Sequence, residues 1–274
     1  PAGEAGLAPC ARAAAVCGAM VTKLAVAVPA LGQQAAGDAT SLRARRCRSQ
    51  RRGRRAAAAG PALPEPSGGR QEYTDETGQV VKVVEWFGHK LHLVVDTEHE
   101  VALAWELTAA NADDGQTQPR VLAQARAAVG KERIKTLAFD AAADHVAVHQ
   151  ELKQANVHPV IQQRELWQGE PERLLPGFAS GAPRVVYDEA GTVYCYDQVS
   201  QPPVRHPLAD IGHEPSRGTI KYRCPALHEN WDCPSCRQCN AGRVYGRTVR
   251  VKQELDLRRF PDLPRATKKF ERLY

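Results

Sequence analysis

The sequence lacks any long apolar segment, and this absence excludes a helical membrane protein. No run reaches the roughly 18 consecutive apolar residues that a membrane-spanning helix requires. Residues 5–31 are rich in Ala and Val, but Arg12 and Lys23 interrupt them and Pro29 ends the stretch. A secretory signal peptide needs a cleaner apolar region near the amino end. We therefore expect a cytoplasmic protein whose residues 1–30 form a leader, either a short amphipathic helix or an irregular segment.

Aromatic residues and methionine are also scarce. Aromatics make up 6% of the chain, there is a single Met, and the first residue is Pro. We expect a fragment, and a second interpretation of residues 1–30 is sequence from outside the native reading frame. Hydrophobic residues at 43% and charged residues at 25% are ordinary for a globular protein. A length of 274 residues suffices for one large or two modest domains.

Acidic residues are missing from residues 43–55, RARRCRSQRRGRR, which hold eight Arg. The formal net charge is +6, so the rest of the chain would be slightly acidic without this run. Such runs bind polyanions or form disordered arms, and the two interpretations are compatible. Contacts to phosphates would make DNA binding salt-dependent. The predicted DNA-binding residues are Arg45, Arg46, Arg48, Arg51, Arg52, Arg54 and Arg55, in an Arg-rich and then Pro/Gly-rich linker at 43–69.

Hydrophobic patterning predicts strands in the first half of the chain. β-branched and aromatic residues at 83–86 and 91–95, and alternation at 101–107, favour three short strands. The polar connection between the last two predicts an antiparallel hairpin. Residues 31–42, LGQQAAGDATSL, favour a strand that carries Asp38.

Helices and strands then alternate. Apolar spacing predicts helices at 117–129 and 144–156, the second with Asp144 as its N-cap. Strands are predicted at 134–139 and 157–162. The order of strands followed by helix, strand, helix and strand is that of a ribonuclease H-like fold, an α/β arrangement of a mixed sheet with flanking helices.

Three spaced motifs resemble the core of DDE-type transposases of bacterial insertion sequences. Residues 87–96 contain a Gly-x-Lys-x-His pattern followed by Asp, residues 109–114 read AANADD, and residues 137–144 read LAFDAAAD. Residues 31–45, with Asp38, resemble the first acidic strand of that family. The similarity covers roughly residues 31–165. It implies a DNA partner at transposon ends and target, a homo-oligomer when full length, and association with the bacterial nucleoid.

The resemblance implies that Asp38 and Asp140 are catalytic and bind divalent cations, Mg²⁺ or Mn²⁺. In the family, two such ions activate the attacking oxygen and stabilise the leaving oxygen in phosphodiester attack. Mg²⁺ prefers carboxylate oxygens as ligands. An alternative role for Asp140 is to cap the turn that follows it. The sequence also departs from the family here, because Ala residues follow Asp140 where the family has Gly and an aromatic residue.

The family also has a third acid, a Glu on a later helix. Glu271 lies in FERLY, which resembles the segment just before that helix. We therefore expect a chain truncated before its third ligand, which would hold metal weakly and catalyse poorly.

Residues 166–264 are predicted to form a mostly β insertion, and residues 265–274 the start of a helical part. The insertion contains four Cys and one His within sixteen positions. Zn²⁺ takes four such ligands, and Cys-x-x-Cys spacing presents two sulfurs to one ion. A structural zinc site is predicted, with iron–sulfur ligation and free thiols as the alternatives. Its predicted ligands are Cys224, Cys233, Cys236 and Cys239, with His228 as an alternative ligand.

The resulting hypothesis is a transposase fragment that binds DNA and, when complete, cleaves and joins DNA strands with metal ions. The alternative is a nonenzymatic, zinc-stabilised DNA-binding remnant, for which the Arg run and the Cys cluster suffice. The alternative predicts zinc and DNA binding without Mg²⁺-dependent nicking.

Overall fold

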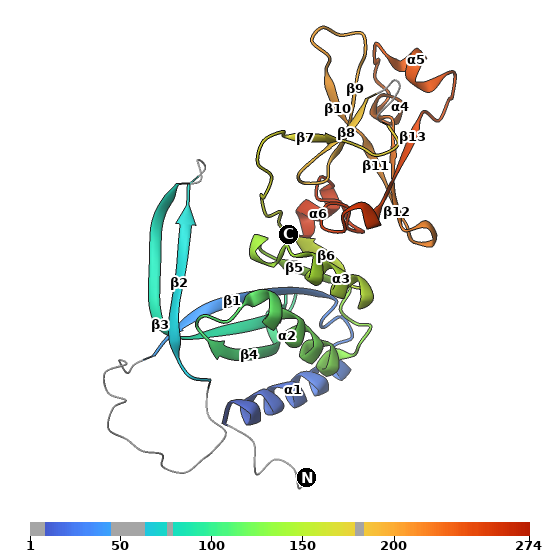
Figure 1. Cartoon of the computed structure of the whole chain (residues 1–274). Coiled ribbons are helices and arrows are strands. Elements are labelled where there is room, and N and C mark those ends of the chain that lie inside the picture. The colour runs from blue at the N-terminus through green and yellow to red at the C-terminus, as the bar shows by residue number, and fades with distance from the viewer. Residues whose placement is uncertain (1–8, 45–63, 76–78, 179–183) are drawn as a thin grey trace. The chain divides into compact units, whose positions relative to one another are not determined.

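The computed structural model describes residues 9–44, 64–75, 79–178 and 184–274 (Figure 1). The chain divides into two compact units, residues 1–137 with 155–157, and residues 138–154 with 158–274. Within the described ranges, no helix combines the length and the apolar character that crossing a membrane requires.

The first unit holds most of a six-stranded sheet, in the order β2-β3-β1-β5-β6 with β4 also paired to β3. Its elements are α1 (Pro9–Ala27), β1 (Gln34–Arg43), β2 (Ser67–Thr74), β3 (Val80–Asp96), β4 (Val101–Ala109), α2 (Asp114–Val129) and the start of β5 (Thr136–Phe139). Helix α2 packs on β3 and β4, and α1 packs on α2 and β4. Val21 and Ala25 of α1 are buried, so this helix is part of the packed unit.

Strand β3 corrects the prediction of separate strands at 83–86 and 91–95. It runs unbroken for 17 residues because its two halves have different partners. Val80–Gly88 pairs with β2, while Gly88–Asp96 lies between β1 and β4. The outer half and β2 form a two-stranded ribbon that extends from the sheet (Figure 1). Residues 67–69, predicted to be linker, therefore begin a strand.

The predicted hairpin is confirmed, with β3 and β4 antiparallel on either side of a turn at 97–100. The predicted order of helix, strand, helix and strand is confirmed too. The elements that complete the sheet region are η2 (Ala141–Ala143), α3 (Val146–Gln154) and β6 (His158–Ile161). The α/β fold class with a mixed sheet and helices is thus as predicted.

The second unit also contains the β-rich region that the sequence predicts. Two antiparallel sheets, ordered β10-β9-β8-β7 and β11-β12-β13, enclose a core that includes Val185, Ile220 and Phe260. The strands are β7 (Glu172–Leu174), β8 (Val185–Asp188), β9 (Val193–Tyr196), β10 (Arg205–Pro207), β11 (Ala209–Glu214), β12 (Thr219–Arg223) and β13 (Thr248–Lys252). The helices are η3 (Pro215–Arg217), α4 (Pro225–Glu229), α5 (Cys236–Asn240), η4 (Gln253–Leu255) and α6 (Lys268–Leu273).

Candidate functional site

Asp38 lies on β1, as predicted, and its side chain is exposed. It stands opposite Leu93 of β3 in the antiparallel register. Its Oδ1 accepts a hydrogen bond from the adjacent backbone N–H of Ala39 at 2.6 Å. The strand therefore presents a solvent-accessible carboxylate, which is the donor type that Mg²⁺ and Mn²⁺ prefer.

Asp140 directly follows β5 and is also exposed. It is the N-cap of the short helix η2, and its Oδ1 accepts a hydrogen bond from the Ala142 N–H at 3.1 Å. The capping role considered for Asp140 is thus real. Its exposure leaves the carboxylate accessible to solvent and ions.

The Gly-x-Lys-x-His motif has a structural explanation. At Gly88 a Cβ atom would collide with the Leu42 carbonyl oxygen of β1, so β1 and β3 can approach closely only at a glycine. Two residues on, Lys90 Nζ donates to Asp114 Oδ1 at 2.9 Å and thereby ties β3 to the first turn of α2.

His92 lies in the same region, with its Nδ1 3.6 Å from Asp114 Oδ1 and its Nε2 2.9 Å from Thr108 Oγ1. His92 is fully buried, although it alternates with Lys90 along the strand. Burial lowers the pKa of His92, which favours a neutral imidazole. The motif therefore holds β1, β3 and α2 together.

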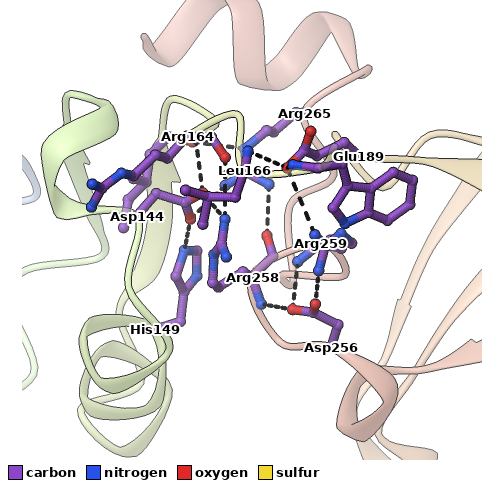
Figure 2. A network of polar contacts seen from close by, with 11 residues as sticks. Asp144, His149, Arg164, Leu166, Glu189, Asp256, Arg258, Arg259 and Arg265 are labelled. Carbon is purple, nitrogen blue, oxygen red and sulfur yellow. Dashed lines mark hydrogen bonds and ion pairs between the residues drawn. The ribbon is translucent and has the colours of Figure 1, made fainter. Parts of the chain in front are cut away.

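Asp144 lies at the centre of a buried polar cluster in the second unit (Figure 2). Its Oδ1 accepts hydrogen bonds from His149 Nε2 at 2.9 Å and from Arg265 Nη2 at 3.0 Å. Its Oδ2 accepts them from Arg258 Nη2 at 2.9 Å and from the Arg164 backbone N–H at 3.0 Å. The predicted N-cap role for Asp144 is wrong, because these four donors occupy the carboxylate instead.

The charges in this cluster offset the cost of burial. Burial acts to raise the pKa of Asp144, but the hydrogen bonds from His149 and Arg258 outweigh it and hold this pKa far below its usual range. Burial lowers the pKa of His149 despite its carboxylate partner. With four donors around one buried carboxylate, Asp144 stabilises the fold and has no lone pairs to spare for a metal.

A second pair of ionic contacts extends the cluster (Figure 2). Glu189 Oε1 accepts hydrogen bonds from the backbone N–H groups of Leu166 and Trp167 at 2.6 and 2.8 Å. Arg259 pairs with Asp256 and lies 3.9 Å from Glu189. The connection after β6 is thereby attached to the β-rich core.

The predicted zinc ligands Cys224, Cys233, Cys236 and Cys239 all line one cavity in the second unit. Cys195 of β9, which lies outside the Cys-x-x-Cys pattern and was not predicted, lines it as well. His228 lines a different cavity. The six described cysteines form no disulfide with one another.

Two predictions, metal binding and DNA binding by the Arg-rich run, compare with the structure as follows. In the described part of the chain, no group of three or more His, Cys, Asp or Glu side chains is arranged as a ready metal site. The predicted DNA-binding residues, Arg45 to Arg55, lie outside the described residues. Asp38 belongs to the first compact unit and Asp140 to the second.

The chain was compared with protein-family models and with curated proteins. Residues 35–190, more than half of the chain, match the family model described as "Transposase DDE domain". The matched segment includes β1 and β5, and with them Asp38 and Asp140. A search of curated proteins found no match to this chain.

Proposed function

Because the chain belongs to the transposase DDE domain family, with its role in transposition and DNA cleavage, we propose that Asp38 and Asp140 bind the divalent cations for this chemistry. The proposal rests mainly on one observation. Two exposed carboxylates stand on β1 and directly after β5. Both lie within the matched segment.

The residues fit the proposed ions. Mg²⁺ and Mn²⁺ take oxygen ligands and usually combine one or two carboxylates with water and substrate phosphates. When bound, such ions activate the attacking oxygen and stabilise the leaving oxygen of a phosphodiester. In this proposal Asp38 and Asp140 bind and orient the ions. The close approach at Gly88 packs β3 against β1, the strand that carries Asp38.

DNA binding is assigned to the Arg-rich residues 45–55. Each Arg that neutralises a phosphate releases counterions, so affinity for duplex DNA should fall steeply as salt rises. Replacing Arg51, Arg52, Arg54 and Arg55 with Gln should reduce both affinity and the slope of its salt dependence. Fluorescence anisotropy with labelled duplex DNA measures both quantities.

The proposed cleavage function is tested with supercoiled plasmid and the full chain in Mg²⁺ or Mn²⁺. Asp38→Asn and Asp140→Asn should each lower the nicking rate at least about a hundredfold, or ~3 kcal/mol of activation free energy. Glu132→Gln, an exposed acid after α2, is the matched control and should leave the rate unchanged. Equal nicking by Asp140→Asn and the unmodified chain would remove Asp140 from the mechanism.

The cysteine-lined cavity favours a second candidate function, a zinc-stabilised DNA-binding protein without nuclease activity. This candidate predicts salt-dependent DNA binding and bound zinc, with no nicking at any Mg²⁺ concentration. The plasmid assay and the anisotropy assay, run on the same preparation, separate the two candidates.

A further inference from the structure

The ribbon formed by β2 and residues 80–87 of β3 belongs to the first unit and extends from its sheet (Figure 1). Strand β2 ends the sheet order, so within the described ranges one of its edges has no strand beside it. Its register with β3 is regular from Ser67 to Tyr73, and residues 67–73 contain neither Lys nor Pro. Native proteins use those residues, and bulges, to block strand pairing at an edge. Among the described residues, this edge of β2 is therefore open to a further strand.

The ribbon also exposes apolar side chains. Tyr73 of β2 is 43% exposed, and Val80, Val81 and Val83 of β3 are 50%, 63% and 43% exposed. A two-stranded ribbon is at most marginally stable in water, whereas three or more strands stabilise one another. A strand that pairs with β2 would therefore stabilise the ribbon through new cross-strand contacts.

Arg70 and Glu72 give β2 a self-complementary pattern of charge. Arg70 Nε donates to Glu72 Oε1 at 3.0 Å, and the two side chains are 60% and 45% exposed. Residues two apart lie on the same face of a strand. In an antiparallel pair of identical strands related by a two-fold axis, directly opposite residues share a face, so their positions differ by an even number. An axis at Gln71 therefore places Arg70 of each copy opposite Glu72 of the other.

The same axis brings Tyr73 opposite Gly69 of the second copy. Gly69 lies under the indole of Trp86, whose Cε2 would be 2.5 Å from a Cβ atom at this position. An aromatic ring opposite a glycine at a sheet edge covers the backbone that the glycine leaves exposed. The ring of Tyr73 would have Trp86 of the second copy as an aromatic neighbour. One register thus suits both the charged and the aromatic residues of β2.

Two other occupants fit the ribbon less well. At the other edge of the ribbon, Lys82 and Glu85 of β3 are three residues apart and so lie on opposite faces. A two-fold pairing of that edge cannot place them opposite each other. DNA binding requires an excess of positive charge, but Arg70 and Lys82 are balanced by Glu72 and Glu85. The charges therefore favour a second copy of β2.

We propose that β2 pairs with β2 of a second copy of this chain, antiparallel and with Gln71 at the two-fold axis. The two ribbons then form one sheet in the order β3-β2-β2-β3. A contact limited to these strands is smaller than a standard protein interface, so the dimer is weak and reversible. This self-association requires neither the proposed cation site nor DNA cleavage.

Disulfide cross-linking of the full chain tests the register. Directly opposite residues of an antiparallel pair have Cα atoms about 4.5–5.5 Å apart, which a disulfide can span. Gln71→Cys should therefore form a covalent dimer when a mild oxidant is added, with the disulfide between the two introduced thiols. Val83→Cys is the matched control, because the two β3 strands would lie roughly 14 Å apart, three strand spacings. It also measures background cross-linking through the native cysteines.

Exchange of the two charges tests the same pairing without a covalent bond. Arg70→Glu places like charges opposite each other and should raise the dimer dissociation constant at least about tenfold in sedimentation velocity. The double variant Arg70→Glu/Glu72→Arg regenerates both opposite-charge pairs and should return to within about threefold of the unmodified chain.

Three results would overturn the proposal. They are an unmodified chain that stays monomeric, equal cross-linking of Gln71→Cys and Val83→Cys, and an unchanged dissociation constant in Arg70→Glu. If Arg70→Glu instead loses affinity for duplex DNA while the dimer persists, the ribbon contacts DNA and the assignment to a second copy is wrong.

Discussion

The carboxylate of Asp140 is exposed beside a single turn, whereas that of Asp144, four residues later, is buried among four donors. The two acids belong to the same segment of the second unit and differ mainly in what surrounds them. Asp140 is a carboxylate that solvent can reach, and Asp144 uses its lone pairs within the fold. Exposure, more than residue type, thus separates a ligand candidate from a structural acid.

The largest expected effect is the loss of stability when the buried acid is neutralised. Asp144→Asn removes the carboxylate that Arg258 and Arg265 contact in a buried site, which should cost about 3–5 kcal/mol in the free energy of unfolding. Asp140→Asn keeps a capping oxygen in an exposed position and should cost less than about 0.5 kcal/mol. Urea denaturation of both variants measures the difference. Similar losses of unfolding free energy in the two variants would contradict the difference between the buried and the exposed carboxylate.

The same comparison should depend on pH in the acid range. The pKa of Asp144 is lowered in the folded state, so the unfolded chain takes up the proton first. Its stabilisation is complete above the unfolded pKa near 3.9 and is lost progressively as pH falls below that value. The stability gap between the unmodified chain and Asp144→Asn should therefore narrow below about pH 4. A gap that stays constant down to pH 2.5 would contradict the assigned charge.

The position of Asp38 on β1 depends on the close packing of β1 against β3 at Gly88. Gly88→Ala places a methyl group against the Leu42 carbonyl and should destabilise the first unit by about 2 kcal/mol. Gly68→Ala is the matched control on β2, where an added Cβ meets no atom within 4 Å. Thermal unfolding of both variants provides the measurement, and equal stability would refute the close approach of β1 and β3.

A smaller effect should come from His149 in the buried cluster. Its pKa is lowered, so it stays neutral in the folded state while the unfolded chain protonates near pH 6.5. Stability should fall by at most about 2 kcal/mol between pH 7 and pH 5, as the unfolded state gains this proton. His149→Gln should flatten this part of the pH profile. His92, whose pKa is lowered in the same direction, should account for the slope that remains.

Local pattern was enough to predict a hairpin and a helix of the first unit. The alternation at 101–107 and the polar turn before it specify the β3–β4 hairpin, and the helical spacing after Asp113 specifies α2. Separate strands were predicted at 83–86 and 91–95, with Gly88 in the gap between them. In the structure it marks the point where β3 changes partners, which depends on long-range pairing.

Side-chain environments were harder to predict because their partners are distant in sequence. Arg258 and Arg265 reach Asp144 across more than 100 residues, so local pattern indicated only a helix cap. Cys195 joins the other cysteines through the pairing of β8, β9 and β10 and shows no Cys-x-x-Cys spacing. The alternation of Lys90 and His92 on β3 did not reveal that His92 is fully buried.

Binding of Mn²⁺ to the full chain, followed by electron paramagnetic resonance, tests the role of the exposed acids most directly. Asp38→Asn and Asp140→Asn should each weaken binding at least about tenfold. The proposal that both carboxylates bind the same ions predicts non-additive losses, so the double variant should bind scarcely more weakly than either single variant. Glu132→Gln should bind like the unmodified chain. Unchanged Mn²⁺ affinity in both single variants would contradict a cation site built on Asp38 and Asp140.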